Sequence, residues 1–519
     1  MFEAAEVGRK ISKETYKAQV PELRAQLLQA QFALSQTKTP VIIIISGVDG
    51  AGRGDVVNAL NEWLDPRGIE TIAIDTPTDE EQSRPHFWRY WRQLPARGRI
   101  GIFFGGWYVD PIQSLAYGDI EPAQMDEMLI QIRRFETMLV EDGALILKYW
   151  LHLPKDEQQQ RLQKLADDPN TRRSVSERDW QHVNLYESFM RAAERAIRHT
   201  DSGNAPWQIV ESTNARYRDL TVAQSVLDNL NQVLAQQQAD EFSRKNRPAT
   251  AAISNFNAGK KTRTVLDTVD LSQTIADKEY EKQLSLYQGQ LHRLAWEAHR
   301  QQRSTLLVLE GWDAAGKGGS IRRMTQAMDA RLYRVISTSA PTDEERNHHY
   351  LWRFWRHIPR AGRVTIYDRS WYGRVLVERV EGFATEMEWK RAYLEINGFE
   401  ENLAKHGIIV LKFWLHIDPD EQLKRFKERE AVPYKRHKIT EEDWRNREKW
   451  DDYVTAIDDM VARTSTEFAP WILVAGNDKR FARLKVLQTV CLHLEKELGL
   501  HQEEKPCPES KLKPKSKSK

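Results

Sequence analysis

Short, mainly apolar runs that are rich in β-branched residues recur along the chain, and longer segments of helical length separate them. In the second half of the chain these runs lie at residues 305–309, 334–337, 364–367, 408–414 and 471–474. Strands that are apolar almost throughout are typical of parallel sheets whose two faces are both covered by helices. The pattern therefore predicts an α/β fold with a doubly wound parallel sheet and right-handed crossovers.

Two of the predicted strands end at residues that could bind a charged ligand. A glycine-rich turn follows Leu309, and Asp368 follows Tyr367. In open parallel sheets, ligands bind beyond the carboxyl ends of the strands. We therefore expect the glycine-rich turn and Asp368 to belong to one site.

The chain contains one long internal repeat. The octet at residues 47–54 recurs at 311–318, a shift of 264 positions, and the same shift aligns further residues without a gap. These further pairs are Trp88 and Trp352, Trp107 and Trp371, Tyr108 and Tyr372, Lys148 and Lys412, Trp180 and Trp444, Pro206 and Pro470, and Trp207 and Trp471. Because short structural repeats recur more than twice at periods of tens of residues, this repeat indicates a tandem duplication of one whole domain.

The duplication sets the predicted domain boundaries. We place the first copy at residues 1–235 and the second copy at 275–500, each opening with a polar helical segment. Residues 236–274 are rich in Gln, basic and small polar residues without sustained periodicity, so we interpret them as a surface linker. The tail at 501–519 alternates Lys with Pro and Ser, which predicts disorder, although an anion-binding arm is an alternative.

Composition narrows the class of protein. The chain has 519 residues and 40% hydrophobic residues, enough for two cores of roughly 230–250 residues each. A net charge of +2 gives no sign of a nucleic-acid partner. Cys491 and Cys507 are too few for a disulfide framework, and no apolar run is long enough for a membrane span or a signal region. We expect a cytoplasmic enzyme or binding protein without a nucleic-acid or membrane partner.

The glycine-rich turn of the second copy has the spacing of a P-loop, or Walker A motif. Gly311 and Gly316 would let backbone N–H groups turn toward phosphate oxygens, and Lys317 would reach the transferring phosphates. The usual Ser/Thr metal ligand is replaced by Gly318. We therefore expect Mg²⁺ to be held by Asp313 and by Asp368, which occupies a Walker-B-like position.

The alternative is a plain glycine-rich turn with Asp368 as a strand-end cap. The first copy argues against that alternative, because Lys317 faces Arg53 there and Asp368 faces Phe104. Two signals at the right topological positions are altered together, which is the pattern of a site that one copy has lost. We therefore interpret the first copy as a pseudo-enzyme that stabilises, dimerises or offers a binding surface.

Further motifs of the second copy carry a resemblance to a known family. They are Gly-Trp-Asp-Ala-Ala-Gly-Lys-Gly-Gly at 311–319, Ala-Pro-Thr at 340–342, Trp-Arg-Phe-Trp at 352–355, Tyr-Asp-Arg-Ser-Trp-Tyr-Gly-Arg at 367–374 and Ala-Pro-Trp at 469–471. The chain closely resembles the polyphosphate kinase 2 family over nearly its whole length, once per copy. The resemblance implies a P-loop kinase-like fold with a helical lid, which moves a terminal phosphoryl group between inorganic polyphosphate and a nucleotide with Mg²⁺.

Chains with two fused copies look like the class that phosphorylates nucleoside monophosphates, so the resemblance implies AMP as acceptor. We also expect a homo-oligomer. Three alternatives stay open: a polyphosphate-dependent nucleoside diphosphate kinase, an ATP-dependent small-molecule kinase, and a non-catalytic polyphosphate- or nucleotide-binding protein. An ATP requirement without any response to polyphosphate would favour the second of these, while intact Lys317 and Asp368 argue against the third.

A comparison of the two copies selects the basic residues that belong to the site, because an abandoned site releases its charges. Positive charge is lost in the first copy at the positions of Arg369, Arg374, Arg429, Lys435, Lys438, Arg463 and Lys479. By contrast, the residues that face Asp313, Arg331, Thr342 and Lys412 are unchanged. Because these residues persist in the copy that has lost the site, we infer that they have a partly structural role. Their persistence weakens the case for a purely catalytic role.

The predicted site combines these selections. The catalytic candidates are Asp313, Lys317, Asp368, Arg369 and Arg429, of which Asp313 and Asp368 are also the metal ligands. The phosphate- and nucleotide-binding candidates are Gly311, Ala315, Gly316, Gly318, Gly319, Arg331, Thr342, Arg374, Lys435, Lys438, Arg463 and Lys479.

The charged segment 420–452 resembles the family's helical lid over the phosphate chain. Within it we interpret Lys424 and Lys427 as a solvated helix face. Trp352 and Trp355, three positions apart, are expected to lie on a helix and to face the protein core rather than to stack on a nucleotide. His348 and His349 are left out of the site, because phosphoryl transfer needs little proton chemistry.

Overall fold

The computed structural model describes residues 1–74, 76–245, 263–432 and 439–500. These residues cluster into two compact units, each built around one sheet. The first unit takes in 1–81, 86–245 and 340–356, and the second takes in 82–85, 263–339 and 357–500. The predicted tail and the middle of the predicted linker lie outside the described residues.

Each copy contributes a five-stranded sheet in which every recorded strand pair is parallel. The strands are β1 (Val41–Gly47), β2 (Ile69–Ala73), β3 (Ile100–Phe104), β4 (Leu145–His152) and β5 (Trp207–Glu211), then β6 (Thr305–Gly311), β7 (Tyr333–Ser337), β8 (Val364–Asp368), β9 (Ile409–His416) and β10 (Trp471–Ala475). The order is β2-β3-β1-β4-β5 in the first sheet and β7-β8-β6-β9-β10 in the second.

The register of the two sheets repeats at the same shift as the sequence. Val41 pairs with Ile100 in the first sheet, and Thr305 pairs with Val364 in the second. In β1, residues 41–45 are at most 1% exposed, as expected for a central strand covered on both faces. The duplication of a doubly wound parallel α/β domain is therefore confirmed.

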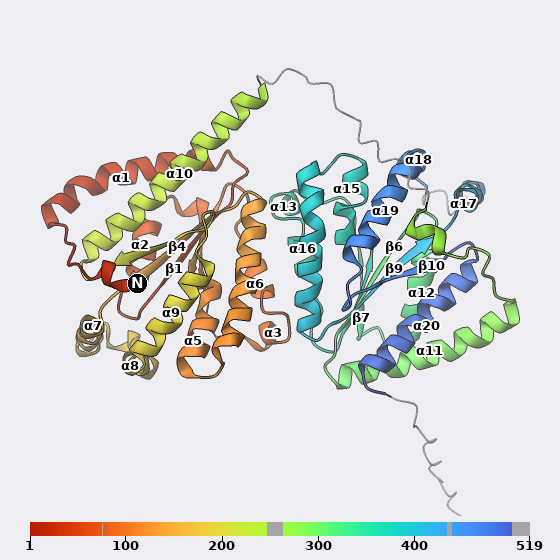
Figure 1. Ribbon diagram of the computed structural model, residues 1–519, viewed down its shortest axis with the longest axis horizontal. Helices are drawn as coiled ribbons and strands as arrows, with labels where there is room; N and C mark the ends of the chain where they lie inside the picture. Colours follow the sequence, from red (N-terminus) through yellow and green to blue (C-terminus); the bar gives the residue numbers. More distant parts are fainter. Residues whose placement is uncertain (75, 246–262, 433–438, 501–519) are drawn as a thin grey trace, which may run out of the picture. The chain divides into compact units, whose positions relative to one another are not determined.

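Helices cover both faces of each sheet (Figure 1). In the first copy they are α1 (Lys13–Leu34), α2 (Arg53–Trp63), α3 (Asp79–Gln82), α4 (Trp88–Trp91), α5 (Val109–Tyr117), α6 (Pro122–Glu141), α7 (Lys155–Asp167), α8 (Glu177–Asn184), α9 (Tyr186–Thr200) and α10 (Ala215–Lys245). The helices α1, α2 and α10 form one layer, while α5, α6 and α9 form the other.

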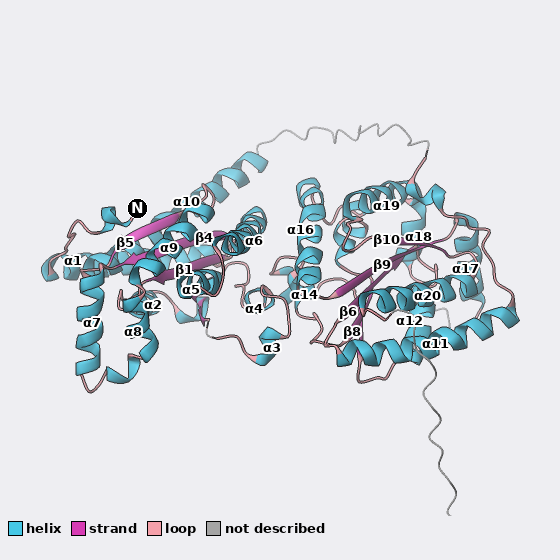
Figure 2. Cartoon of the chain, turned by 60° about the horizontal axis from the view of Figure 1, so that its bottom comes forward, coloured by secondary structure: helices cyan, strands magenta, loops and turns pink. Residues whose placement is uncertain are grey.

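The second copy repeats these layers, with α11, α12 and α20 on one face and α16 with α19 on the other (Figure 2). Its helices are α11 (Asp277–Arg300), α12 (Lys317–Ala327), α13 (Asp343–Arg346), α14 (Trp352–Trp355), α15 (Val377–Val380), α16 (Glu386–Lys405), α17 (Pro419–Ala431), α18 (Glu441–Glu448), α19 (Trp450–Thr464) and α20 (Lys479–Glu497). Trp352 and Trp355 are buried, as predicted. No helix among the described residues has the length and apolar character needed to cross a membrane.

The connector between the copies is shorter than the predicted linker at 236–274. Helix α10 continues to Lys245, because Gln, Ala, Glu and Lys favour helix and the first proline of the segment is Pro248. At the other end, the backbone N–H of Val265 donates to Asp458 Oδ1 at 2.7 Å, and Leu266 is buried. Both ends of the predicted linker are therefore structured.

A buried lysine network is built identically in both copies. Lys412 on β9 donates from Nζ to Glu400 Oε2 at 2.7 Å, to the Tyr372 hydroxyl at 2.8 Å and to the Thr464 carbonyl at 2.7 Å. Lys148 on β4 donates to the equivalent three groups of the first copy. Because the copy without the P-loop lysine keeps this network, it belongs to the fold.

Candidate functional site

The predicted P-loop joins β6 to α12. Gly311 has φ of 147°, and a Cβ there would lie 2.5 Å from the Leu415 carbonyl oxygen. Gly316 has φ of 115° and immediately precedes α12. Only glycine fits at position 311, where the backbone passes close to Leu415. The turn places the N-terminus of α12 at the carboxyl ends of the strands.

Lys317 begins α12 and lies back over the loop. Its Nζ donates to the carbonyl oxygens of Gly311 at 2.6 Å and Trp312 at 3.2 Å. Carbonyls hold an ammonium group without neutralising its charge. The lysine is thus positioned at the loop with its positive charge available for an anion.

Asp313 lies within the loop with its side chain 14% exposed and both carboxylate oxygens occupied. Oδ1 accepts from Arg369 Nη2 at 2.9 Å, and Oδ2 accepts from Asn446 Nδ2 at 3.0 Å. Burial alone would raise the pKa of Asp313, but the positive charges of Lys317 and Arg369 and the Asn446 hydrogen bond outweigh burial and lower that pKa. Asp313 is therefore held as a carboxylate.

Asp368 ends β8 and pairs in register with Leu309 of β6, beside the start of the P-loop. Its carboxylate makes no ion pair or side-chain hydrogen bond with the residues that the structure describes. Across the same residues, no three acidic, histidine or cysteine side chains gather into a metal cage. Mg²⁺ commonly keeps several waters and takes one or two carboxylates, so Asp368 fits as a direct ligand. Asp313 would first have to exchange a hydrogen-bond partner.

Arg369 follows Asp368 and has a left-handed backbone, with φ of 63°. The next residue, Ser370, donates from Oγ to Glu310 Oε1 at 2.8 Å. Glu310 is buried at the end of β6; its burial raises its pKa, while the positive charges of Lys317 and Arg369 oppose that shift. The turn after β8 is therefore tied to the strand that leads into the P-loop.

Several neutral side chains of the predicted lid contact the loop. Gln422 on α17 donates to the Asp313 carbonyl at 3.2 Å, and Asn446 on α18 reaches the Asp313 carboxylate. Trp450, at the start of α19, stacks on Trp312 with ring centroids 3.6 Å apart and planes 6° apart. The loop and the segment after the lid are thus packed together.

Arg429, near the end of α17, interacts electrostatically with the Asp313 carboxylate. Burial lowers its pKa, and the carboxylates of Asp443 and Asp313 act in the opposite direction. Lys435 and Lys438 lie outside the described residues. Lys424 and Lys427 are exposed, which agrees with a solvated helix face.

Arg425 on α17 has a structural role that the sequence pattern did not indicate. It is 2% exposed and donates to the carbonyls of Ala314, Ala315, Gly476 and Asn477. The first copy keeps this role, because Arg161 donates to the carbonyls of Gly50, Ser212 and Thr213. Arg425 supports the loop from behind and is not one of the lid's free charges.

The remaining candidates make contacts away from the loop. Arg331 pairs with Asp329, Arg374 with Glu378 and Lys479 with Glu428, while Arg463 lies over the ring of Tyr393 and Thr342 caps α13. The Arg331 pair recurs as Arg67 with Asp65, as the sequence comparison suggested for a structural position. Gly318 and Gly319 lie in the first turn of α12, where Gly318 faces open space and Gly319 faces Arg483.

Sequence reasoning missed Glu310 and Asn446. The signal was present in the repeat, because Ser46 faces Glu310 and His182 faces Asn446. Loss of positive charge selects only basic residues, and neither Glu310 nor Asn446 is basic. Glu310 meets Ser370 of the turn after β8, and Asn446 of the lid meets Asp313 of the loop, so both contacts join segments that are distant in the sequence.

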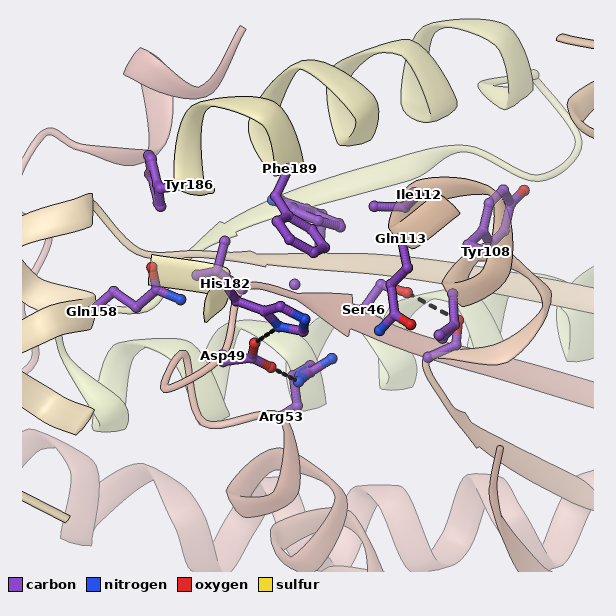
Figure 3. A pocket seen from close by; sticks show the side chains of 15 residues that line it. Ser46, Asp49, Arg53, Tyr108, Ile112, Gln113, Gln158, His182, Tyr186 and Phe189 are labelled. Carbon is purple, nitrogen blue, oxygen red and sulfur yellow. Dashed lines mark hydrogen bonds and ion pairs between the residues drawn. The ribbon is translucent and has the colours of Figure 1, made fainter. Parts of the chain in front are cut away.

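The first copy closes the equivalent place with its own side chains (Figure 3). The carboxylate of Asp49 is paired with Arg53 and with His182. Arg53 also lies over the ring of Phe104, 5.1 Å from its centroid. What remains is a cavity of about 60 Å³ lined in part by apolar residues such as Ile112 and Phe189. With its loop cation neutralised, this copy has no equivalent of the second copy's arrangement.

A parallel α/β sheet with a glycine-rich loop, a loop lysine and a strand-end aspartate defines a protein of the P-loop phosphoryl-transfer class. The sequence profile of Polyphosphate kinase 2 matches residues 10–238 and again 274–502. The chain therefore belongs to the polyphosphate kinase 2 family, with the family domain present twice.

Relatives share the two-domain arrangement over nearly their whole length. The chain is 50% identical over 491 residues to a polyphosphate:AMP phosphotransferase of Pseudomonas aeruginosa, covering 94% of this chain and 98% of that protein. It is 36% identical over 481 residues to the protein of the same name from Acinetobacter johnsonii, covering 91% and 96%. A crystal structure of a Pseudomonas aeruginosa chain described as a polyphosphate kinase 2 has a TM-score of 0.85 and 48% identity, covering 97% of this chain and 100% of that chain.

Proposed function

We propose that the chain transfers the terminal phosphoryl group of inorganic polyphosphate to a nucleoside monophosphate, converting AMP to ADP with Mg²⁺. The observation that carries the proposal is the contrast between the copies at one place. The second copy combines Lys317, Asp313 and Arg369 with Asp368, whose carboxylate has no ion pair or hydrogen-bond partner among the described residues, whereas the first copy has closed that place. The names of its two-domain relatives supply the acceptor.

The catalytic work of these side chains is positioning and charge stabilisation. The donor's terminal phosphoryl would lie at the loop between Gly311 and Gly316, with Lys317 turned from the loop carbonyls to the phosphate oxygens. Arg369 and Arg429 would offset charge on the equatorial oxygens as the acceptor attacks in line. An AMP phosphate oxygen is already ionised near neutral pH, so no general base is needed.

Magnesium fits the acidic end of this arrangement. Asp368 would hold the ion directly, and Asp313 would join it after exchanging a partner or through a bound water. Bound there, Mg²⁺ would neutralise phosphate charge as the phosphoryl group leaves the donor. Asp313 otherwise keeps Arg369 and the lid's Asn446 together at the loop.

The other candidates extend the site toward the rest of the polyanion and the nucleotide. We propose phosphate- or nucleotide-binding roles for Ala315, Gly318, Gly319, Arg331, Thr342, Arg374, Lys435, Lys438, Arg463 and Lys479. Arg331 and Thr342 also have local structural roles, in the ion pair with Asp329 and in the cap of α13. We also propose a homo-oligomer in the cytoplasm, with the first copy as a non-catalytic half.

A product analysis tests the proposal against its alternatives. Purified protein would be incubated with Mg²⁺, long-chain polyphosphate and each nucleoside mono- or diphosphate in turn, and the products identified. ADP from AMP is the expected product. Faster formation of ATP from ADP would favour a nucleoside diphosphate kinase, and turnover that requires ATP without responding to polyphosphate would favour an ATP-dependent kinase.

A further inference from the structure

The hydrogen bond between Ser370 and Glu310 is a buried polar contact that the mechanism above does not use. Ser370 is 2% exposed and Glu310 is 5% exposed. Burying a carboxyl group is unfavourable unless it is hydrogen-bonded, and Ser370 supplies a hydrogen bond to Glu310. The contact joins the end of β6 to the turn after β8.

Arg369 sits between the two β-strand ends that this contact joins, in a backbone conformation that favours glycine. Its φ is 63°, and the equivalent residue of the first copy is Gly105 with φ of 81°. A residue with a side chain occupies the left-handed region at an energetic cost and persists there when its surroundings hold it. Both copies therefore have a left-handed residue directly after the strand, which in the second copy is long and charged. The backbones then differ, since Gly106 has φ of 59° and Ser370 has φ of −147°.

The backbone anchor of this turn is shared, whereas the side-chain contacts are not. The N–H of Arg369 donates to the Leu309 carbonyl at 3.2 Å, as the N–H of Gly105 does to the Ile45 carbonyl at 2.9 Å. In the second copy, Ser370 Oγ additionally accepts from the Tyr372 N–H while donating to Glu310. Ser370 is thereby fixed from both sides.

The three residues of this arrangement are replaced together in the first copy. Ser46 stands at the position of Glu310, Gly105 at that of Arg369 and Gly106 at that of Ser370. The neighbouring Trp107 and Tyr108 are unchanged, and they contact Glu136 as their equivalents contact Glu400. The fold therefore survives without the Glu310–Ser370 contact once glycine makes the turn.

We infer that Glu310 and Ser370 are positioning residues that hold Arg369 in its left-handed turn and so direct its guanidinium at Asp313 and the transferring phosphoryl group. The inference rests on the proposed site. It assigns Glu310 a role through its hydrogen bond and through Arg369, without contact with substrate. Catalysis depends on placement to within about 1 Å, so a turn that no longer holds Arg369 would lower kcat.

Substitutions at Glu310 and Ser370, made in the parent enzyme and in an Arg369→Gly background, test this role. Glu310→Ala and Ser370→Ala should each lower kcat by about 10- to 100-fold while the KM for AMP changes less than about threefold. Glu310→Gln keeps an acceptor oxygen for Ser370 and should stay within about threefold of the parent kcat. In an Arg369→Gly background, neither alanine substitution should lower kcat further by more than about threefold, because residues acting through one group are not additive.

Ser46→Ala is the matched control, since Ser46 Oγ bonds the Gly105 carbonyl in the copy proposed to be inactive. Thermal unfolding of each variant shows whether a decrease in kcat comes from lost positioning or from an unfolded protein. If Glu310→Ala does not fold, Ser370→Ala provides the test. If Glu310→Ala or Ser370→Ala lowers kcat in the Arg369→Gly background as much as in the parent enzyme, the positioning role is wrong. The proposed catalytic site is not contradicted by that result. Equal losses for Glu310→Gln and Glu310→Ala would overturn the hydrogen-bond mechanism. An Arg369→Gly enzyme with unchanged turnover would instead overturn the proposed site.

Discussion

Asp313 accepts a hydrogen bond from Arg369 at 2.9 Å, a partner 56 positions away on another strand end. The equivalent Asp49 is paired with Arg53, the residue at the position of the loop lysine. In the second copy the cation hydrogen-bonded to the loop carboxylate comes from outside the loop, whereas Lys317 donates to two backbone carbonyls and acts on Asp313 through its charge alone. Lys317 can therefore turn to a phosphate without breaking a hydrogen bond to Asp313.

We therefore expect Lys317→Ala to abolish turnover while Arg53→Ala leaves it nearly unchanged. Removing a preorganised cation from a transferring phosphoryl group should lower kcat by at least about 10²-fold. Arg53→Ala leaves His182 to pair with Asp49, so the first copy should keep its fold. Steady-state kinetics of the two variants side by side decide the matter, and comparable losses would show that both copies contribute to catalysis.

The metal assignment makes a separate prediction for Asp368. An amide is a poorer Mg²⁺ ligand than a carboxylate, so Asp368→Asn should raise the Mg²⁺ concentration for half-maximal velocity by about tenfold or more. Chelation should abolish turnover of the parent enzyme, and added Mg²⁺ should restore it. Asp451→Asn, at an exposed position on α19, is the control. An unchanged Mg²⁺ dependence for Asp368→Asn would remove Asp368 from the metal site.

Sequence patterns predicted the strands of the second copy closely because central parallel strands are apolar on both faces. The run at 305–309 became β6, which continues to Gly311. The pairing register repeats at the shift of the sequence repeat, as an ungapped duplication requires. Ala and Gln, however, suit both a helix and a linker, so the end of α10 could not be read from composition.

The missed part of the site depends on contacts between distant segments. Glu310 meets Ser370 across 60 positions, and Asn446 meets Asp313 across 133. Nor does charge alone distinguish a lid arginine that could contact the ligand from one that is buried against the loop. Arg425 and Arg429 lie one helical turn apart on α17, yet Arg425 is bonded to four carbonyls behind the loop.

The buried lysine network should govern stability rather than chemistry. Lys412→Met leaves Glu400 buried without its ammonium partner, and such a broken pair typically costs about 3–5 kcal/mol of unfolding free energy. Lys148→Met should cost the first unit a similar amount, because Glu136 loses the same partner. Denaturant unfolding of both variants measures this, with exposed Lys424→Met as the control. A Lys412→Met enzyme of normal stability and no turnover would make Lys412 catalytic.

The acceptor prediction follows from relatives and not from an identified contact. With polyphosphate as donor, AMP should be converted to ADP, and ADP should be a poor acceptor. Initial rates for both acceptors under the same Mg²⁺ and polyphosphate concentrations provide the measurement. If ATP forms from ADP faster than ADP forms from AMP, the acceptor class is wrong although the fold and the loop site remain.

The lid should bind the polyanion through charge. Arg429 is half-buried on α17 and acts electrostatically on Asp313, whereas Leu165 stands at its position in the first copy. The frame of the lid persists there, since Asp443 and Trp444 recur as Asp179 and Trp180. The first copy has thus kept the helix and lost the charge, which is the expected trace of an abandoned polyphosphate contact.

Arg429→Ala and Lys435→Ala should each weaken apparent affinity for long polyphosphate more than for AMP. Each should also lower the slope of log affinity against log salt concentration by about one, as for other polyanions that lose one paired charge. Lys424→Ala, which removes an exposed charge of the same helix, is the matched control and should change neither quantity. Titrations of polyphosphate and AMP at several ionic strengths give both slopes. An unchanged salt slope with selectively weakened AMP binding would place Arg429 and Lys435 on the nucleotide side and reverse the proposed order of the two substrates.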